Sequence, residues 1–209
     1  MICNVKVIGI CGRSGSGKGF VCRVFKSFGV PCIDTDLVYR ELLSLEGSPC
    51  LREIVSEYGD IVLNSEKKLD RRALANIVFS DKSGNKLKRL NSITHKYILN
   101  ETLSLIESFS REGFESVIID APVLFESRFN ELCDLIFCVT APTDILIDRI
   151  CERDGRSKAE AVARLESQMD ERALAQLSDE ILVNDGCSDV SEQVSAIVKK
   201  YGLGGERYE

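Results

Sequence analysis

The sequence predicts an α/β fold, with helices packed around a doubly wound five-stranded parallel sheet. The first observation is a set of five short apolar runs that are continuous rather than alternating, which is typical of strands buried on both faces. The second is that segments with helical spacing lie between them. Strand followed by helix, repeated, predicts parallel strands joined by right-handed crossovers. The expected strands are Val5–Cys11, Val30–Asp34, Val117–Asp120, Leu135–Thr140 and Ile181–Asn184.

The helix after the first strand is predicted by Phe20, Val24 and Phe28, which recur every four residues. About 80 residues then separate the second strand from the third, far more than one crossover helix needs. We therefore expect a helical insertion over about residues 37–113. The remaining core would comprise residues 1–36, 114–151 and 177–209 of a single domain. The helices expected in the insertion are Leu37–Leu45, Pro49–Tyr58, Arg71–Phe79 and one from Asp81 to about Arg111.

A second inserted segment, about residues 152–176, is dense in alternating charge. This pattern is typical of a pair of solvated amphipathic helices.

Composition and charge exclude several classes of function. The chain has 209 residues and a formal net charge of -6, which argues against coating nucleic acid or an anionic membrane through bulk charge. Because His95 is the single histidine, a metal site built from several histidines is excluded. No stretch approaches the roughly 18–20 apolar residues of a membrane span. The nine cysteines include no C-x-x-C pair, so we expect reduced thiols in a cytoplasmic protein.

A glycine-rich segment directly after the first strand predicts a phosphate-binding loop. Gly12, Gly17 and Lys18 fit the G-x-x-x-x-G-K pattern of a P-loop. Glycines let backbone N–H groups turn toward a phosphate, and the following helix presents its positive end to the same anion. The residues expected to hold the nucleotide here are Gly12, Arg13, Ser14, Gly15, Ser16, Gly17, Lys18, Gly19 and Phe20.

One position departs from the P-loop pattern. Ser or Thr is expected after the lysine, because its hydroxyl binds Mg²⁺, but this sequence has Gly19. The missing oxygen should weaken metal binding unless water or a carboxylate replaces it. Asp120 ends an apolar strand in a Walker-B-like pattern and is the expected Mg²⁺ ligand. Adenylate-kinase-type loops also read G-K-G at this point, so Gly19 does not by itself indicate an inactive site.

A cluster of two acids, Asp34 and Asp36, follows the second strand. Ligands of open α/β sheets bind at the carboxyl ends of the strands, and we expect the second strand to lie beside the P-loop strand. Asp36 would then accept the proton of an attacking hydroxyl. The alternative for this cluster is a helix cap, which Asp34 or Thr35 fits well.

Further motifs follow in order along nearly the whole chain. They are Arg40, LDRRAL (Leu69–Leu74), LNSITH ending at His95, APVLFE (Ala121–Glu126), DRICERDG with Arg149 and Arg153, the R-x3-Q of Arg164 and Gln168, and VNDG (Val183–Gly186). In this order they resemble the dephospho-CoA kinase family, which performs the last step of coenzyme A biosynthesis. The sequence departs from the family at Lys96, where a proline usually follows the histidine.

The resemblance implies transfer of the γ-phosphoryl group of ATP to the 3′-hydroxyl of dephospho-CoA, with Mg²⁺ as cofactor. It implies catalytic roles for Lys18, Asp36 and Arg149. Residues 152–176 look like the lid of small nucleotide kinases, and the helical insertion would hold the pantetheine arm and adenosine of the acceptor. Arg153 would bind ATP and Asn184 would meet its adenine. Contacts with the acceptor are implied for Asp36, Arg40, Arg71, His95 and Glu126.

Some of these residues also fit structural roles. His95 lies near the end of an apolar helical stretch, Glu126 would serve to hold the loop before it, and Arg71 would begin a solvated helix. The alternative functions are another small P-loop nucleotide or metabolite kinase and a catalytically weak nucleotide-binding regulator. A GTPase switch fails because Asn85-Lys86 is not part of an N-K-x-D motif. No heptad repeat or exposed apolar strip indicates an oligomeric state.

Overall fold

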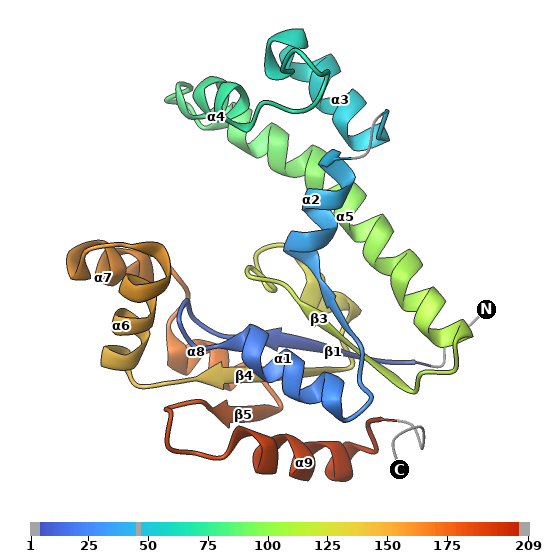
Figure 1. Ribbon diagram of the computed structural model, residues 1–209, viewed down its shortest axis with the longest axis vertical. Coiled ribbons are helices and arrows are strands. Elements are labelled where there is room, and N and C mark those ends of the chain that lie inside the picture. The colour runs from blue at the N-terminus through green and yellow to red at the C-terminus, as the bar shows by residue number, and fades with distance from the viewer. Residues whose placement is uncertain (1–4, 45–46, 205–209) are drawn as a thin grey trace. The chain divides into compact units, whose positions relative to one another are not determined.

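The sheet consists of five parallel strands in the order β2-β3-β1-β4-β5. The computed structural model describes residues 5–44 and 47–204 (Figure 1). The strands are β1 (Lys6–Cys11), β2 (Cys32–Asp34), β3 (Ser116–Asp120), β4 (Leu135–Thr140) and β5 (Glu180–Val183). This arrangement confirms the predicted doubly wound α/β fold, and the strand order reverses at β1, the strand that precedes the P-loop.

The neighbour of β1 differs from the expected one. The expectation that the second strand lies beside the P-loop strand is wrong, because β3 pairs with both β1 and β2. The crossover from β1 to β2 leaves room for one strand between them in the sheet. The chain returns after the long helical segment and forms β3 there. The carboxyl ends of these strands still coincide, since Asp120 is in register with Ile10 on one side and with Asp34 on the other.

The chain separates into two compact units, one comprising Met1–Asp34 and Ile106–Glu209, the other Thr35–Leu105. In the first unit, α1 (Lys18–Ser27) and α9 (Val190–Tyr201) cover one face of the sheet (Figure 1). Their apolar side chains join those of the strands in one core, in which Phe25 stacks on Phe137 with ring centroids 5.9 Å apart. The core fixes the positions where the strands end, and therefore the loops that follow them.

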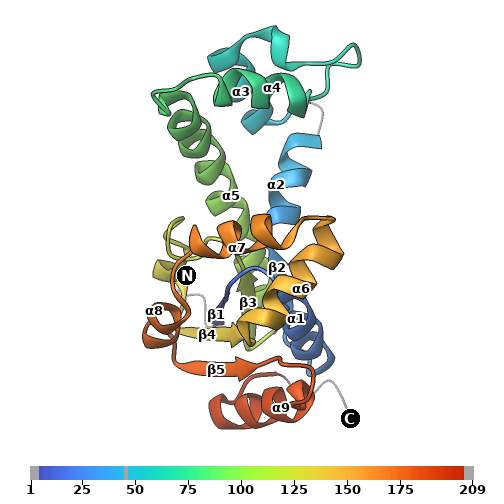
Figure 2. The ribbon, with the colours of Figure 1, turned by 90° about the vertical axis from the view of Figure 1, so that its left-hand side faces the viewer.

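Three helices of the first unit lie between β4 and β5: α6 (Thr143–Asp154), α7 (Lys158–Glu166) and α8 (Glu171–Gln176). The helices α6 and α7 pack against each other through a small core that includes Leu146, Ile150 and Leu165 (Figure 2). A capping box of Ser157 and Glu160 begins α7, which satisfies its first backbone donors. The two helices expected in the charged segment are confirmed as α7 and α8.

The second unit is helical and has its own core of residues such as Ile54, Leu74 and Ile93. Its elements are α2 (Thr35–Ser44), α3 (Pro49–Tyr58), a 3₁₀ turn η1 (Asp60–Val62), α4 (Arg71–Phe79) and α5 (Asn85–Arg111), whose last turns belong to the first unit. The four predicted helices are therefore confirmed, although Leu45, the expected end of the first, lies outside the described residues.

One of these helices begins later than expected. The long helix α5 starts at Asn85 rather than at Asp81, because the Asp81 carboxylate accepts hydrogen bonds from the backbone N–H groups of Ser83 and Lys86. This local turn competes with the helix. No helix in the described part of the chain has the length and apolar character needed to cross a membrane.

Candidate active site

The P-loop runs from Gly12 to Lys18 between β1 and α1, and its shape requires glycine. Gly17 precedes α1 with φ of 87°, a left-handed conformation that costs glycine little. A Cβ at Gly17 would collide with the side-chain amide of Asn184, and one at Gly12 would collide with the backbone oxygen of Val139. The loop is therefore packed closely against the end of β4 and the residue that follows β5.

Three side chains hold the outward carbonyl groups of the P-loop. Lys18 Nζ donates to the Gly12 oxygen at 2.7 Å, and Arg149 Nη1 donates to the Gly15 oxygen at 3.3 Å. Asn184 Nδ2 donates to the Ser16 oxygen at 2.7 Å. Arg149 also donates to the backbone oxygen of Asn184 at 2.9 Å. The loop is thus fixed in place by α1, α6 and the residue after β5.

The electrostatics of the loop centre on Lys18. Burial lowers the pKa of the Lys18 ammonium, while the negative charges of Asp120 and Cys11 oppose that shift. Cys11 contributes because a hydrogen bond with the thiol of Cys138 lowers its pKa to about 7. A bound polyphosphate would add negative charge beside Lys18 and so favour the charged ammonium.

Residues 152–176, the segment that the family resemblance predicts to be a lid and that is called the lid segment below, contact two successive P-loop residues. Arg13 Nη2 donates to the backbone oxygen of Leu165 at 2.8 Å, and the Ser14 backbone N–H donates to Gln168 Oε1 at 2.9 Å. Arg153 Nη2 also donates to Ser14 Oγ at 3.3 Å. Arg153 therefore lies beside the P-loop, and its contact with nucleotide phosphate stays a prediction.

A cavity of about 250 Å³ opens next to the P-loop. Its walls come from the first residues of the loop, from the segment after β3 that includes Glu126, and from the lid around Gln168. The cavity therefore places Glu126 beside the P-loop, within the first unit. The lining residues are Cys11, Gly12, Arg13, Pro122, Val123, Leu124, Phe125, Glu126, Ser167, Gln168, Met169 and Leu174.

Asp120, the expected Mg²⁺ ligand, lies in the first unit. It ends β3, and its charge acts on Lys18. Among residues 5–44 and 47–204, no three His, Cys, Asp or Glu side chains gather as a metal cage would require. Mg²⁺ needs no such cage, because it commonly binds one or two carboxylates, substrate phosphates and water. Asp120 and a bound nucleotide fit that chemistry.

The remaining predicted site residues lie in the second unit. Asp36 and Arg40 are exposed one turn apart on α2. Arg71 is the first residue of α4. Its charge opposes the rise that burial causes in the pKa of Tyr39, which lies on α2 between Asp36 and Arg40 in the sequence. His95 is partly buried on α5. The next residue, Lys96, forms an ion pair with Glu53 at 2.6 Å, so this departure from the family pattern supplies a contact between α5 and α3.

Comparison with known proteins decides the family. The sequence profile of the dephospho-CoA kinase family matches residues 6–189. The chain belongs to the dephospho-CoA kinase family. A dephospho-CoA kinase from Bacillus cereus is 34% identical over 198 residues, which cover 94% of this chain and 98% of the relative. The chain is therefore a kinase, as its P-loop and fold indicate.

Solved structures agree with membership of the dephospho-CoA kinase family. A protein from Thermus thermophilus matches 96% of this chain and all of its own, with 30% identity and a TM-score of 0.79. A dephospho-CoA kinase from Campylobacter jejuni covers 93% of this chain and 96% of its own, with 26% identity and a TM-score of 0.68. The similarity thus extends over both units.

Sequence reasoning included Arg164 only among the arginines expected over the phosphates, and it assigned no role to Asp154 or Gln168. Arg164 and Gln168 were visible only as the R-x3-Q motif, and Asp154 only as part of a charged run. The structure shows Asp154 paired with Arg164, and Gln168 hydrogen-bonded to the P-loop. The R-x3-Q motif was the signal, and the structure places Arg164 in the last turn of α7 and Gln168 two residues beyond its end.

Proposed function

We propose that this chain transfers the γ-phosphoryl group of ATP to the 3′-hydroxyl of dephospho-CoA. The observation that carries the proposal is a formed P-loop, contacted by Arg149 and Arg153, in a chain whose match to the dephospho-CoA kinase family extends over residues 6–189. The rival reading, a small P-loop kinase with another acceptor, does not account for the match over the helical unit. A catalytically weak regulator does not account for the lid contacts.

The first unit would bind ATP. The P-loop backbone would hold the β-phosphate, and Lys18 would neutralise charge that develops between the β- and γ-phosphates. Arg149 fastens Gly15 through Nη1, and its other guanidinium donors would meet the phosphates from the lid side together with Arg153. Asn184 would lie at the adenine end, where its side chain also fixes the Ser16 carbonyl.

The second unit would supply most of the acceptor site. Asp36 would accept the proton of the 3′-hydroxyl, with Arg40 one helical turn away on the same helix. Arg71 and His95 would contact the acceptor from α4 and α5, and Glu126 of the first unit would do so from the cavity beside the P-loop. The helical insertion would hold the adenosine and the pantetheine arm.

Mg²⁺ would be bound through Asp120 and the phosphates of ATP. When bound, the ion supplies positive charge to the β- and γ-phosphoryl oxygens. Asp120 also acts without the metal, since its negative charge favours the protonated form of Lys18. The position of Asp120 supports both roles, because it ends β3, and β3 pairs with the P-loop strand β1.

The test is an ADP-release assay with Mg-ATP and one of four acceptors: dephospho-CoA, AMP, shikimate or adenosine. We expect turnover with dephospho-CoA at least 100-fold above the others, because only this acceptor would use the groups that the helical unit presents. Tight ATP binding without turnover of dephospho-CoA would refute the proposal. Preferred turnover of another acceptor would favour the rival kinase.

A hydroxyl at position 19, where the sequence departs from the P-loop pattern, should strengthen the binding of Mg²⁺. A Cβ at Gly19 would have only Arg23 Nη1 within 4 Å, at 3.9 Å, so Gly19→Ser fits without displacing a neighbour. We expect the Mg²⁺ concentration for half-maximal activity to fall by roughly tenfold, the lower end of what even outer-shell partners contribute. The measurement is a magnesium titration of the ADP-release rate.

The matched control for this substitution is Gly19→Ala, which adds the Cβ without the oxygen. It should leave the titration midpoint where the wild type has it. An identical midpoint for Gly19→Ser and Gly19→Ala would show that position 19 does not contact the metal.

A further inference from the structure

Asp154, the last residue of α6, pairs with two lid arginines. Its Oδ1 accepts from Arg153 Nε at 2.7 Å, and its Oδ2 accepts from Arg153 Nη2 at 2.9 Å. Arg164 Nη1, from α7, donates to the same Oδ2 at 3.1 Å. The Asp154 side chain is 22% exposed, whereas those of Arg153 and Arg164 are 57% and 41% exposed. One carboxylate thus joins the end of α6 to α7.

Helix stability does not explain an acid at this position. A carboxylate in the last turn of a helix faces the negative end of the helix dipole, which disfavours it. The helix ends through Gly155, which caps α6 with φ of 65°, a common stop that needs no acidic neighbour. The two arginines are therefore the interactions that favour Asp154 here.

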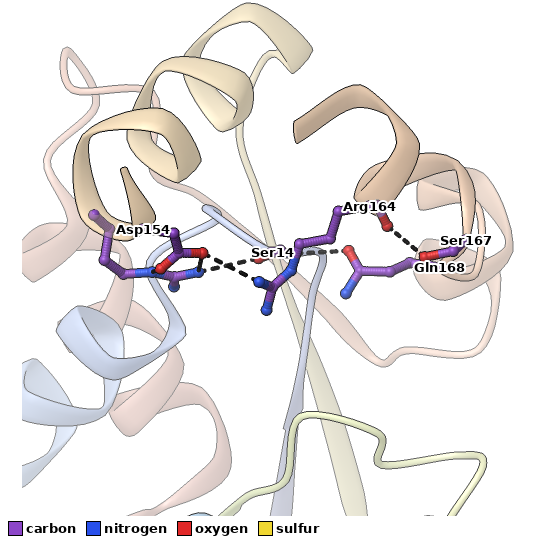
Figure 3. Close-up of polar contacts among 6 residues, drawn as sticks. Ser14, Asp154, Arg164, Ser167 and Gln168 are labelled. Atoms are coloured by element: carbon purple, nitrogen blue, oxygen red, sulfur yellow. Dashed lines mark hydrogen bonds and ion pairs between the residues drawn. The ribbon is translucent and has the colours of Figure 1, made fainter. Parts of the chain in front are cut away.

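Arg153 connects this group of charged side chains to the P-loop. Arg153 Nη2, which Asp154 holds, also reaches Ser14 Oγ, and the Ser14 backbone N–H donates to Gln168 beyond the end of α7 (Figure 3). A guanidinium has five N–H donors, so the edge that faces Asp154 leaves the Nη1 group of Arg153 for another anion. Arg164 uses Nη1 to bind Asp154, so its Nε and Nη2 groups are likewise left to bind another anion.

We propose that Asp154 is a positioning residue that holds Arg153 beside the P-loop and brings Arg164 to the same carboxylate, so that both arginines can act on the transferred phosphoryl group. The inference rests on the proposed function, because it assigns these arginines to ATP. Two flexible arginine side chains lose conformational freedom when they converge on one anion. Their pairing with Asp154 restricts that freedom before ATP binds, which is the advantage of preorganised charge in phosphoryl transfer.

The protonation of Asp154 agrees with this role. The hydrogen bond from Arg153 lowers the pKa of the Asp154 carboxyl below its usual range, and the charges of Arg164 and Arg156 act in the same direction. A carboxyl with such a pKa stays ionised at neutral pH. Exposed ion pairs contribute little to folding stability, so losing this pair should affect catalysis more than the melting temperature.

The test is Asp154→Asn in the full chain, assayed with ATP and dephospho-CoA. We expect kcat to fall by about tenfold or more, the scale at which a displaced group affects phosphoryl transfer. The Kd for ATP should change by less than about threefold, because removing the negative charge strengthens the attraction of the arginines for phosphate while their placement worsens. Asp154→Glu, which keeps the carboxylate, should recover at least about a third of the wild-type kcat.

The matched control is Asp148→Asn, which removes the same charge from the same helix. Asp148 is 62% exposed and pairs with Lys158 at 3.6 Å, and its substitution should leave kcat within about twofold of wild type. The inference is overturned if Asp154→Asn also stays within twofold, or if it acts only by lowering the melting temperature. Failure of the wild type to turn over dephospho-CoA would instead refute the proposed function.

A double substitution separates positioning from an independent effect. If Asp154 acts through Arg164, then Asp154→Asn combined with Arg164→Met should lower kcat by less than the product of the two single losses. Losses that multiply would overturn the inference, since they would show that the two residues act separately.

Discussion

Replacing Lys18 by methionine should lower kcat/KM for ATP by roughly 10²–10³-fold, the usual cost of losing one preorganised donor to a developing charge. The Lys18 ammonium donates to the Gly12 carbonyl and is partly buried, and the charge of Asp120 opposes the lowering of its pKa by burial. Methionine keeps an unbranched stem of similar length but carries no charge. The measurement is the ADP-release rate as a function of ATP concentration.

The control for Lys18→Met is Lys26→Met, the same substitution in the last turn of α1. Lys26 is exposed, and its loss should change kcat/KM by less than about twofold, because helix-end charges contribute little at the surface. Melting temperatures of both variants show whether the fold is kept. A Lys18→Met protein with more than about a tenth of wild-type activity would contradict the role given to Lys18.

Replacing Asp36 by asparagine should lower kcat by roughly 10²–10⁴-fold, the contribution typical of a general base. Asparagine keeps the shape of the side chain but cannot accept the proton of the 3′-hydroxyl. Affinity for ATP should stay nearly unchanged, because the proposed ATP contacts lie in the first unit and Asp36 belongs to the second. The measurements are kcat for dephospho-CoA and the Kd for ATP, each on the same protein.

Glu41→Gln gives the matched control for Asp36, since it neutralises another exposed carboxylate on α2. It should leave both kcat and ATP affinity within about twofold of wild type. If Asp36→Asn weakened ATP binding in proportion to its loss of kcat, Asp36 would instead be a ligand of the nucleotide or its metal. Retention of full kcat would remove Asp36 from the reaction altogether.

The fold was predictable from the sequence because its signals are local. Each strand is a continuous apolar run, and the P-loop follows β1 directly, so neither depends on knowing distant contacts. Pairing between strands is different. The sequence places Asp34 and Asp120 at strand ends, but only the structure shows that β3 separates β2 from β1. Strand order depends on how a long helical segment returns to the sheet, which no local pattern encodes.

The same distinction applies to the site. Lys18 and the glycines were predictable because one short segment contains the whole motif. The lid contacts were not, since Gln168 reaches Ser14 across 154 residues of chain. Asn184 shows a further limit: its position near the nucleotide was expected from a motif, but its hydrogen bond to the Ser16 carbonyl depends on packing around Gly17. Side-chain partners of this kind follow from tertiary structure alone.

The hydrogen bonds to the P-loop carbonyls have a thermodynamic consequence. The donors are Lys18, Arg149 and Asn184. The loop acquires its shape when the chain folds, so the loss of backbone entropy belongs to folding and not to ligand capture. Association with a polyphosphate then carries little further ordering cost in the loop, and affinity reflects the contacts themselves. A flexible glycine loop of the same sequence would have to be ordered by every ATP molecule that bound. In this protein the P-loop is already ordered in the folded state, before ATP binds.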